Sequence, residues 1–226
     1  MILVATGLKQ ELNILEGAGV LVVAGGGDGA RLERELEEAA GDASAVISMG
    51  LCGALAPDLK PGDWVVASEV ISNRNICQTD AEWSATLVKA LRAQTGPMLG
   101  SDTMIADVAA KADAHTATGA IAVDMESHIA AAVAARHNLP FAVARVVSDA
   151  AGRSLPRAAQ AGMAADGSMD IGAVLRALAA DPRQLPALIR VGAEAGKAFR
   201  ELRRGRDFLG PGLGRSYVGQ LPLNVA

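Results

Sequence analysis

Glu126 and Asp149 are the carboxylates whose positions in this sequence best suit proton transfer on a bound molecule. Glu126 stands at the head of an alanine-rich segment with helical spacing, and Asp149 follows an apolar run at 141–147 that is typical of a buried strand. A carboxylate at the start of a helix and another just past the end of the following strand can converge on one cleft. Such a pair could hold a small polar molecule and move protons on it.

Each candidate carboxylate also has a purely structural interpretation. Glu126 could interact with the N-terminus of its own helix, and Asp149, with Ser148, could cap a helix or a turn. Glu11 lies one helical turn past a Thr-Gly pair and could be an exposed helical charge. The histidines form no set of metal ligands, so the sequence predicts no metal site.

A glycine-rich loop, Gly25-Gly26-Gly27-Asp28-Gly29, lies between a predicted strand and a predicted helix. Helix N-termini favour anions, so this loop could cradle a phosphate, and it loosely matches a dinucleotide fingerprint. Asp28 would repel a pyrophosphate there. A close approach of the backbone to another ligand and a plain structural turn are the remaining interpretations.

The composition excludes several classes of protein. With 226 residues, of which 50% are hydrophobic and 3% aromatic, the chain can build a sizeable core from aliphatic side chains. The net charge of -4 and the scarcity of aromatic side chains argue against nucleic-acid binding. Two cysteines are too few for a disulfide framework. The sequence shows neither a signal peptide nor a membrane span, which predicts a cytoplasmic protein.

Short apolar runs alternate with helical patterns up to about residue 150, which predicts a single-domain three-layer α/β/α sandwich with a mixed, mostly parallel central sheet. Ligands of such sheets bind at the carboxyl ends of the strands. The predicted domain covers residues 1–204, of which 155–204 form a helical C-terminal part, and residues 205–226 form an extended tail rich in glycine and proline. The predicted strands are 2–5, 20–24, 45–49, 64–70, 97–99, 121–123 and 141–147, and the predicted helices are 11–16, 31–40, 83–92, 126–136, 169–180 and 183–204.

The string VISMGLCGALAPDLKPGDWVV at residues 46–66 resembles the central signature of the purine and uridine phosphorylase superfamily. Within it, the closest well-known branch is methylthioadenosine/S-adenosylhomocysteine nucleosidase. Residues 124–127 and 145–149 match the family's ribose and purine segments in order and spacing. The strings at 161–170 and 181–188 are similar to a narrower group, the hopanoid-associated nucleoside phosphorylases. Those enzymes are thought to remove adenine from adenosylhopane, a lipid precursor of hopanoids.

The resemblance implies a role for each residue of the two strings. Glu126 corresponds to the glutamate that binds the ribose hydroxyls, with Met125 packing against the sugar. Asp149 corresponds to the aspartate that protonates or hydrogen-bonds nitrogen 7 of the purine, with Ser148 supporting it. Glu11 occupies the position of the nucleosidase carboxylate that positions or activates water. Backbone contacts to the base are implied at Val123 and Asp124.

These residue types suit cleavage of an N-glycosidic bond. The reaction develops positive charge on the ribose and negative charge on the departing purine. A protonated carboxyl beside nitrogen 7 neutralises the purine, and burial among apolar groups would favour that protonated form of Asp149. Hydrogen bonds from the ribose hydroxyls to Glu126 would hold the sugar and favour the oxocarbenium-like state.

The nucleophile stays open between phosphate and water. Many phosphorylases grip phosphate with an arginine and a serine that flank the central glycine, whereas Ser48 and Leu51 stand at those positions here. A substitute phosphate site could form elsewhere, or Glu11 could serve a water. Phosphate is therefore a possible co-substrate, and no cofactor is expected. The candidate phosphate or water site comprises Thr6, Gly7, Lys9, Gly25, Gly26, Gly27, Ser48 and Gly50.

The leading hypothesis is an enzyme that releases adenine from a 5′-extended adenosine, with adenosylhopane as the substrate that the resemblance implies, by phosphorolysis or hydrolysis. The alternatives are a nucleosidase for methylthioadenosine or S-adenosylhomocysteine and a non-catalytic nucleoside-binding protein. The resemblance also implies a homo-oligomer. Basic residues between 197 and 206 could form a solvated face or, with a lipid-linked substrate, a peripheral contact with the inner membrane.

Overall fold

A mixed eight-stranded sheet forms the centre of the computed structural model, which describes residues 1–73, 75–161, 168 and 170–215. Its strands are β1 (Ile2–Thr6), β2 (Val20–Ala24), β3 (Ala45–Ala54), β4 (Trp64–Ile71), β5 (Ile76–Gln78), β6 (Gln94–Gly100), β7 (Ala122–Asp124) and β8 (Phe141–Asp149). They run in the order β2-β1-β3-β7-β6-β4-β5, and β8 pairs with both β3 and β4. Most pairings are parallel, as predicted; the antiparallel ones are β3 with β7, β4 with β5, and β4 with β8.

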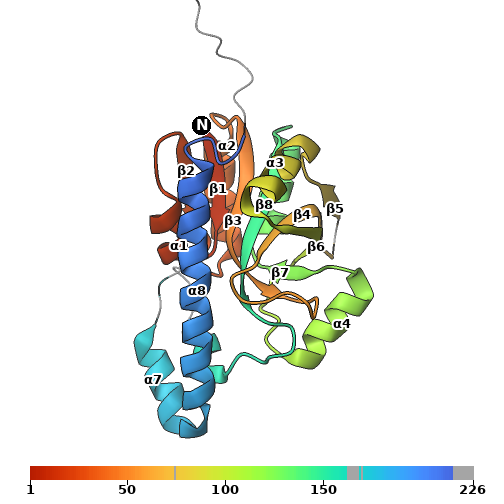
Figure 1. The fold of residues 1–226 in the computed structure, drawn as a ribbon. Helices are drawn as coiled ribbons and strands as arrows, with labels where there is room; N and C mark the ends of the chain where they lie inside the picture. Colours follow the sequence, from red (N-terminus) through yellow and green to blue (C-terminus); the bar gives the residue numbers. More distant parts are fainter. Residues whose placement is uncertain (74, 162–167, 169, 216–226) are drawn as a thin grey trace, which may run out of the picture.

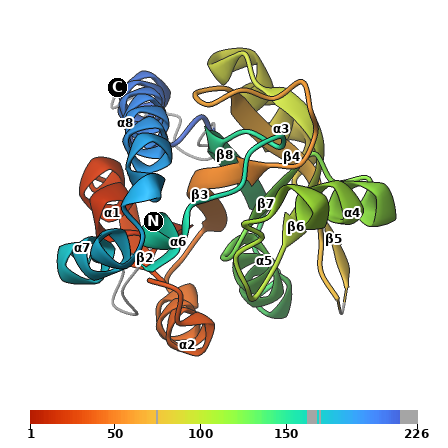
Figure 2. The ribbon, with the colours of Figure 1, turned by 90° about the horizontal axis from the view of Figure 1, so that it is seen from below.

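Helices cover both faces of the sheet, so the predicted layered α/β architecture is confirmed (Figure 1). The helices are α1 (Lys9–Leu15), α2 (Gly29–Ala40), α3 (Ala81–Leu91), α4 (Val108–Thr118), α5 (Ser127–Arg136), α6 (Arg157–Ala161), α7 (Ile171–Ala180) and α8 (Leu185–Leu209). One core cluster lies between the sheet and α2 with α5, and another between the sheet and α1, α3 and α8 (Figure 2). Within the described residues, no helix is both long and apolar enough to cross a membrane.

Three strand ends meet at Gly53 and bring distant parts of the sequence together. β3 and β8 run parallel, and after a register shift near Cys52 the last pair joins Gly53 to Asp149. β7 approaches from the other side and pairs Val123 with the same glycine. A Cβ at Gly53 would lie 3.3 Å from an Asp149 carboxylate oxygen, so glycine keeps the space beside that carboxylate open.

β3 and β8 run further than the sequence predicts. β3 continues through Gly50 and Gly53 to Ala54, and Ser148 and Asp149 belong to β8 instead of following it. Glycine disfavours a strand locally, but β3 is paired with β1, β8 and β7 along its length. Tertiary pairing therefore overrides the local signal that predicted an early end.

Three elements of the structure were not predicted, namely β5, α4 and α6. The sequence of α4, VAAKADAHTAT, has no apolar stripe, because this helix lies at the edge of the domain and Lys111 is its one buried residue. Apolar periodicity is the main signal for a helix, so a helix that contributes no apolar face escapes it.

The C-terminal boundary also differs from the prediction. α8 runs to Leu209 instead of ending at Arg204, because Gly205 lets the helix lie against Trp64, where a Cβ would approach a ring carbon to 2.3 Å. Leu213 is buried, and its carbonyl accepts a hydrogen bond from Trp83 Nε1 at 2.9 Å. The start of the predicted tail therefore packs on the domain, while residues 216–226 and position 169 lie outside the described residues.

Candidate functional site

A cavity of about 230 Å³ opens where the carboxyl ends of β1, β3, β7 and β8 meet the loop before α5. It lies at the edge of the sheet where ligands of such folds bind. Three predicted carboxylates, Glu11, Glu126 and Asp149, line this one cavity. The other predicted residues in its lining are Gly7, Val123, Asp124, Met125 and Ser148.

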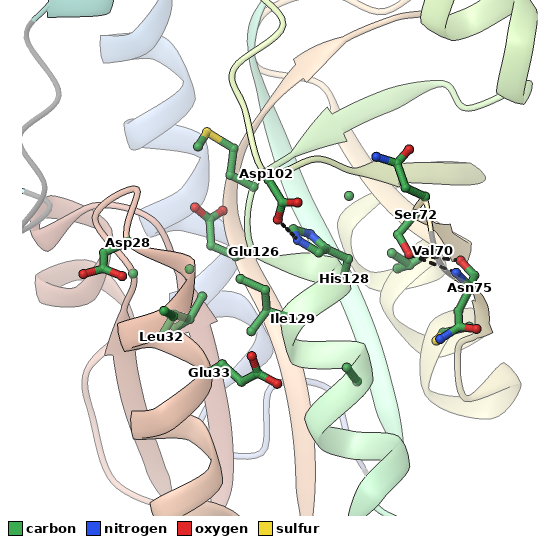
Figure 3. A pocket seen from close by; sticks show the side chains of 18 of the residues that line it. Asp28, Leu32, Glu33, Val70, Ser72, Asn75, Asp102, Glu126, His128 and Ile129 are labelled. Atoms are coloured by element: carbon green, nitrogen blue, oxygen red, sulfur yellow. Dashed lines mark hydrogen bonds and ion pairs between the residues drawn. The ribbon is translucent and has the colours of Figure 1, made fainter.

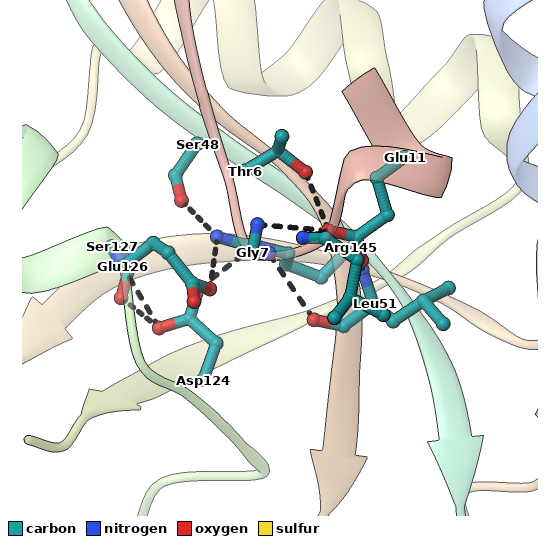
Figure 4. Close-up of polar contacts among 10 residues, drawn as sticks. Thr6, Gly7, Glu11, Ser48, Leu51, Asp124, Glu126, Ser127 and Arg145 are labelled. Carbon is teal, nitrogen blue, oxygen red and sulfur yellow. Dashed lines mark hydrogen bonds and ion pairs between the residues drawn. The ribbon is translucent and has the colours of Figure 1, made fainter. Parts of the chain in front are cut away.

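Arg145 organises the Glu126 side of the cavity from within β8 (Figure 4). Its side chain is completely buried, and Nη2 lies 3.0 Å from Glu126 Oε2 and donates to Ser48 Oγ at 2.5 Å. Nε lies 2.8 Å from Asp124 Oδ2, and Nη1 donates to the Leu51 carbonyl at 3.2 Å. One guanidinium thus fixes two carboxylates, and the sequence analysis did not identify it.

The surroundings of Glu126 bring its titration to neutral pH. Burial raises the pKa of Glu126 to about 7; Arg145 opposes this shift, whereas the negative charges of Asp124 and Glu11 add to it. Glu126 precedes the first residue of α5, and its side chain makes no capping bond there. The side chain therefore does not cap α5 by a hydrogen bond, and its carboxylate lines the cavity.

Asp124 serves the structure of the site through its side chain. Oδ1 accepts hydrogen bonds from Ser127 N at 3.1 Å and Ser127 Oγ at 2.5 Å, which fixes the start of α5. Its carbonyl accepts from Ser101 N at 2.9 Å. The bonds of this residue therefore hold Glu126 and Met125 at the cavity.

Glu11 is buried, so its interpretation as an exposed charge is wrong. Oε2 accepts hydrogen bonds from Thr6 Oγ1 at 2.7 Å, Gly7 N at 2.8 Å and Leu8 N at 2.7 Å. Oε1 accepts from Leu51 N at 2.8 Å. Four donors from β1, the start of α1 and β3 thus hold one carboxylate at the cavity wall.

The candidate phosphate residues do not come together around one anion site. Thr6 and Gly7 already donate to Glu11, and the amides of Gly25 and Gly26 donate to the carbonyls of those two residues at 2.8 and 2.7 Å. The glycine-rich loop is thereby tied to the end of β1.

The remaining candidates lie apart from the cavity. Ser48 is buried beneath Arg145, and a Cβ at Gly50 would lie 2.8 Å from that guanidinium, so both positions pack against Arg145. Lys9 is exposed on α1. Gly27 lines a different hollow.

That second hollow, a groove of about 610 Å³, lies between α2, α5 and the β4–β5 hairpin (Figure 3). Its polar lining includes the carboxylates of Asp28, Glu33 and Asp102, and His128 Nε2 lies 3.0 Å from Asp102 Oδ1. The glycine-rich loop faces this groove. A phosphate there would meet several negative charges, which contradicts the loop's interpretation as a phosphate cradle.

The other side of the cavity is built around Asp149. Ser148 Oγ donates to Asp149 Oδ1 at 2.8 Å and lies 3.1 Å from the Cys52 carbonyl, so the serine orients the carboxylate as predicted for a supporting residue. The other oxygen, Oδ2, accepts a hydrogen bond from the ammonium of Lys111 on α4. The surroundings of Asp149 are therefore not purely apolar, and the sequence analysis missed this lysine.

Apolar side chains from the C-terminal helices close the cavity. Val191, Ala195 and Phe199 follow one another along one side of α8, and Leu155 and Ala159 come from the segment around α6. Thr103, Met104 and Ile105, from the loop after β6, complete this side. We call these eight residues the apolar wall. None of them was singled out from the sequence.

Comparison with known proteins identifies the family of the chain and solved structures with a similar fold. Residues 14–180 match the family model described as the phosphorylase superfamily. No curated protein sequence matches the chain. A 5′-methylthioadenosine/S-adenosylhomocysteine nucleosidase from Helicobacter pylori superimposes with a TM-score of 0.62 at 14% identity, covering 90% of this chain and 96% of that one.

Two further solved structures are similar. The corresponding nucleosidase from Colwellia psychrerythraea, in complex with adenine, gives a TM-score of 0.62 at 22% identity over 78% of this chain and 95% of that one. Futalosine hydrolase of Helicobacter pylori gives 0.60 at 16% identity over 80% and 97%. At these identities the likeness concerns the fold.

Proposed function

The chain belongs to the phosphorylase superfamily, and we propose that it cleaves the N-glycosidic bond of a 5′-extended adenosine and releases adenine. The observation that carries this proposal is that Glu11, Glu126 and Asp149 line one cavity at the carboxyl edge of the sheet. The similar nucleosidases act on adenine nucleosides by name, and one of them was solved with adenine.

We assign the purine to the Asp149 end and the ribose to the Glu126 end. The Asp149 carboxyl gives a proton to nitrogen 7 as the bond electrons move onto the purine. Glu126, ionised above its pKa of about 7, accepts hydrogen bonds from the ribose hydroxyls. Arg145 holds Glu126 in place for this task. Val123 and Met125 then pack beside the base and the sugar.

We propose water as the nucleophile. Three carboxylates, those of Glu11, Asp124 and Glu126, surround the single guanidinium of Arg145, so the ribose end carries no excess positive charge for a phosphate. Four of the donors suggested for a phosphate site already bind Glu11 or backbone carbonyls, namely those of Thr6, Gly7, Gly25 and Gly26. Glu11, fixed by four hydrogen bonds, is placed to accept a proton from an attacking water.

The apolar wall supports an apolar 5′ substituent, and we propose a lipid-linked nucleoside such as adenosylhopane. Four exposed aliphatic side chains continue from the wall along α7 and the first turns of α8, which project past the sheet (Figure 1). We call them the apolar patch: Ile171, Leu175, Leu185 and Ile189. The patch and the wall share α8, and we propose that a long acyl or polycyclic chain leaves the cavity along this helix.

The test is adenine release from three substrates by the purified full-length protein. Adenosylhopane in detergent, methylthioadenosine and S-adenosylhomocysteine are each incubated with and without phosphate, and free adenine and the sugar product are separated by chromatography. We expect adenine and free ribose-type product without phosphate, with the highest kcat/KM for adenosylhopane.

Each other outcome of this test has a definite meaning. A strict phosphate requirement with a ribose 1-phosphate product would overturn water as the nucleophile. If methylthioadenosine or S-adenosylhomocysteine is preferred, the natural 5′ substituent is a small thioether and the proposal of a lipid-linked substrate is wrong. Tight binding of adenosine analogues without any adenine release would make the protein a nucleoside-binding protein.

We further propose that the apolar patch contacts an anionic bilayer. Exposed arginines at 176, 183 and 190 stand among its aliphatic side chains, and this combination suits an anionic lipid surface. The basic segment at 197–206 fits this less well, because Lys197 donates to the Pro61 carbonyl at 2.7 Å and buried Arg206 donates to the Leu15 carbonyl at 2.9 Å. The proposed location is therefore the cytoplasmic side of a membrane.

Flotation with phosphatidylglycerol vesicles tests this contact. The Leu175→Glu/Ile189→Glu double variant should stay at the bottom of the gradient while the unaltered protein floats. Phe208→Glu is the matched control, since Phe208 is 72% exposed near the far end of α8 and should leave flotation unchanged. Equal flotation of the double variant would contradict the contact. We also propose a homo-oligomer, which light scattering on the protein without vesicles tests.

A further inference from the structure

Lys111 is a buried lysine whose ammonium points at the proposed acid of the reaction. It lies on α4, its side chain is 0% exposed, and it donates to Asp149 Oδ2. It also donates to the carbonyl oxygens of Ala150 and Arg153, each at 3.1 Å. These three acceptors use all three donors of an ammonium group.

Lys111 and Asp149 form a buried ion pair. A buried ammonium is costly unless an opposite charge faces it, and here the partner carboxylate is also buried. An adjacent cation favours the ionised form of a carboxyl group. Asp149 therefore faces a cation instead of the purely apolar surroundings that the sequence analysis expected.

The other ionisable groups near Asp149 leave this pairing undisturbed. Cys52 on β3 faces it, and burial raises the pKa of the Cys52 thiol well above its usual range, so the thiol stays neutral. Arg153, in the loop after β8, is paired with Glu194 on α8. Ser148 is neutral and donates to Asp149 Oδ1.

Both oxygens of the Asp149 carboxylate are therefore held, one by Ser148 and one by Lys111. The same ammonium ties the loop at 150–153 to α4, so one side chain fixes both the carboxylate and the segment that follows it. Gly53 leaves the side facing the cavity open.

We propose that Lys111 is a positioning residue that makes Asp149 a stronger acid toward the departing purine, an inference that rests on the proposed function. Asp149 takes up a proton from solvent as the nucleoside binds and delivers it to nitrogen 7 while the C–N bond electrons pass to the purine. Lys111 keeps its own proton throughout. Its positive charge stabilises the carboxylate that reappears in the transition state, at the expense of the protonated population at high pH.

Lys111→Met and Lys111→Arg separate this role from a packing role. We measure kcat/KM for the best substrate between about pH 5 and pH 9. In the unaltered protein kcat/KM should fall below about pH 7, where Glu126 becomes protonated, and should fall again on the high-pH side, where the acid is no longer protonated. In Lys111→Met the high-pH fall should move upward by about one unit or more, and the maximum should drop about 10- to 100-fold. Lys111→Arg should keep the original midpoint. An unchanged midpoint in Lys111→Met would overturn the proposal.

A second measurement does not depend on the turnover of any variant. The infrared difference spectrum between the protein and Asp149→Asn at neutral pH should show the loss of a carboxylate band. Loss of a protonated carboxyl band instead would refute the ion pair. If no nucleoside is cleaved at all, the proposed function fails, while this spectrum still decides the state of Asp149.

Discussion

The cavity has two unlike sides, a polar floor and an apolar wall. The floor comes from β1, β3, β8 and the head of α5, and its buried carboxylates are fixed by Arg145, Lys111 and backbone amides. The wall comes from α8, the segment around α6 and the loop after β6, and it carries no charged side chain. In the proposed function the floor determines which bond is broken, and the wall determines which 5′ substituent is accepted.

The two sides also differ in how firmly the fold holds them. The floor lies where the two core clusters on either face of the sheet meet the strand ends. By contrast α7, which supports the outer end of the wall, buries none of its residues, and α6 buries one, Ala158. A change in the floor should thus affect chemistry and stability together, whereas a change in the wall should affect selectivity alone.

Asp149→Asn should have the largest effect. The amide keeps the size of the side chain and a contact with Ser148, but it has no acidic proton for the purine. We expect kcat to fall about 100- to 10,000-fold with little change in KM. Steady-state adenine release measures this. Asp102→Asn, in the second groove, is the control and should retain full activity. Unchanged turnover in Asp149→Asn would remove that residue from the acid role.

Arg145→Met should destabilise the floor by about 3–5 kcal/mol, because it leaves Asp124 and Glu126 buried without their counter-charge. Urea unfolding followed by circular dichroism gives the free energy of unfolding. Arg136→Met is the matched control: Arg136 pairs with Glu33 at 2.7 Å on the surface, its side chain is 46% exposed, and its loss should cost less than about 1 kcal/mol. A similar loss of unfolding free energy in both variants would contradict the larger contribution of the buried ion pairs in the floor.

Glu126 should make substrate binding depend on pH near neutrality. Its pKa is raised from 4.5 to about 7, so the ionised acceptor of ribose hydroxyls disappears as pH falls below about 7. We expect the affinity for a 5′-alkylthio adenosine analogue to fall about tenfold per pH unit below that point, and calorimetry measures it. The same shift acts on stability in the opposite sense: its contribution is full below pH 4.5 and is lost as pH rises through 7. Glu126→Gln should abolish both dependences.

Sequence reasoning found the floor better than the wall. Glu11, Glu126 and Asp149 lie at the boundaries between strands and helices, where the sheet topology itself brings side chains together. Arg145 could have been found, because a single charge inside the apolar run 141–147 indicates a buried partner. Lys111 had no such signal, since α4 carries no apolar stripe.

The sequence could not predict residues whose place in the site depends on how their helix or loop packs against the sheet. The glycine-rich loop follows a strand, as a phosphate-binding loop would. After β2, however, the loop runs so that Gly27 lines the second groove and not the cavity. Phe199 and Val191 lie in a long helix whose sequence does not say which strand end it covers. The superfamily resemblance of residues 46–66 is confirmed by the family match, but that string describes β3 and β4 and leaves the wall undetermined.

The wall should show the smallest and most selective effect. Phe199→Ala removes a ring from the cavity without touching the floor, so kcat/KM should fall about tenfold for a substrate with an apolar 5′ chain and stay the same for adenosine. Phe208→Ala on the same helix, 72% exposed, is the matched control and should change neither value. An equal fall for both substrates would mean that α8 supports catalysis itself, and the division between floor and wall would then be wrong.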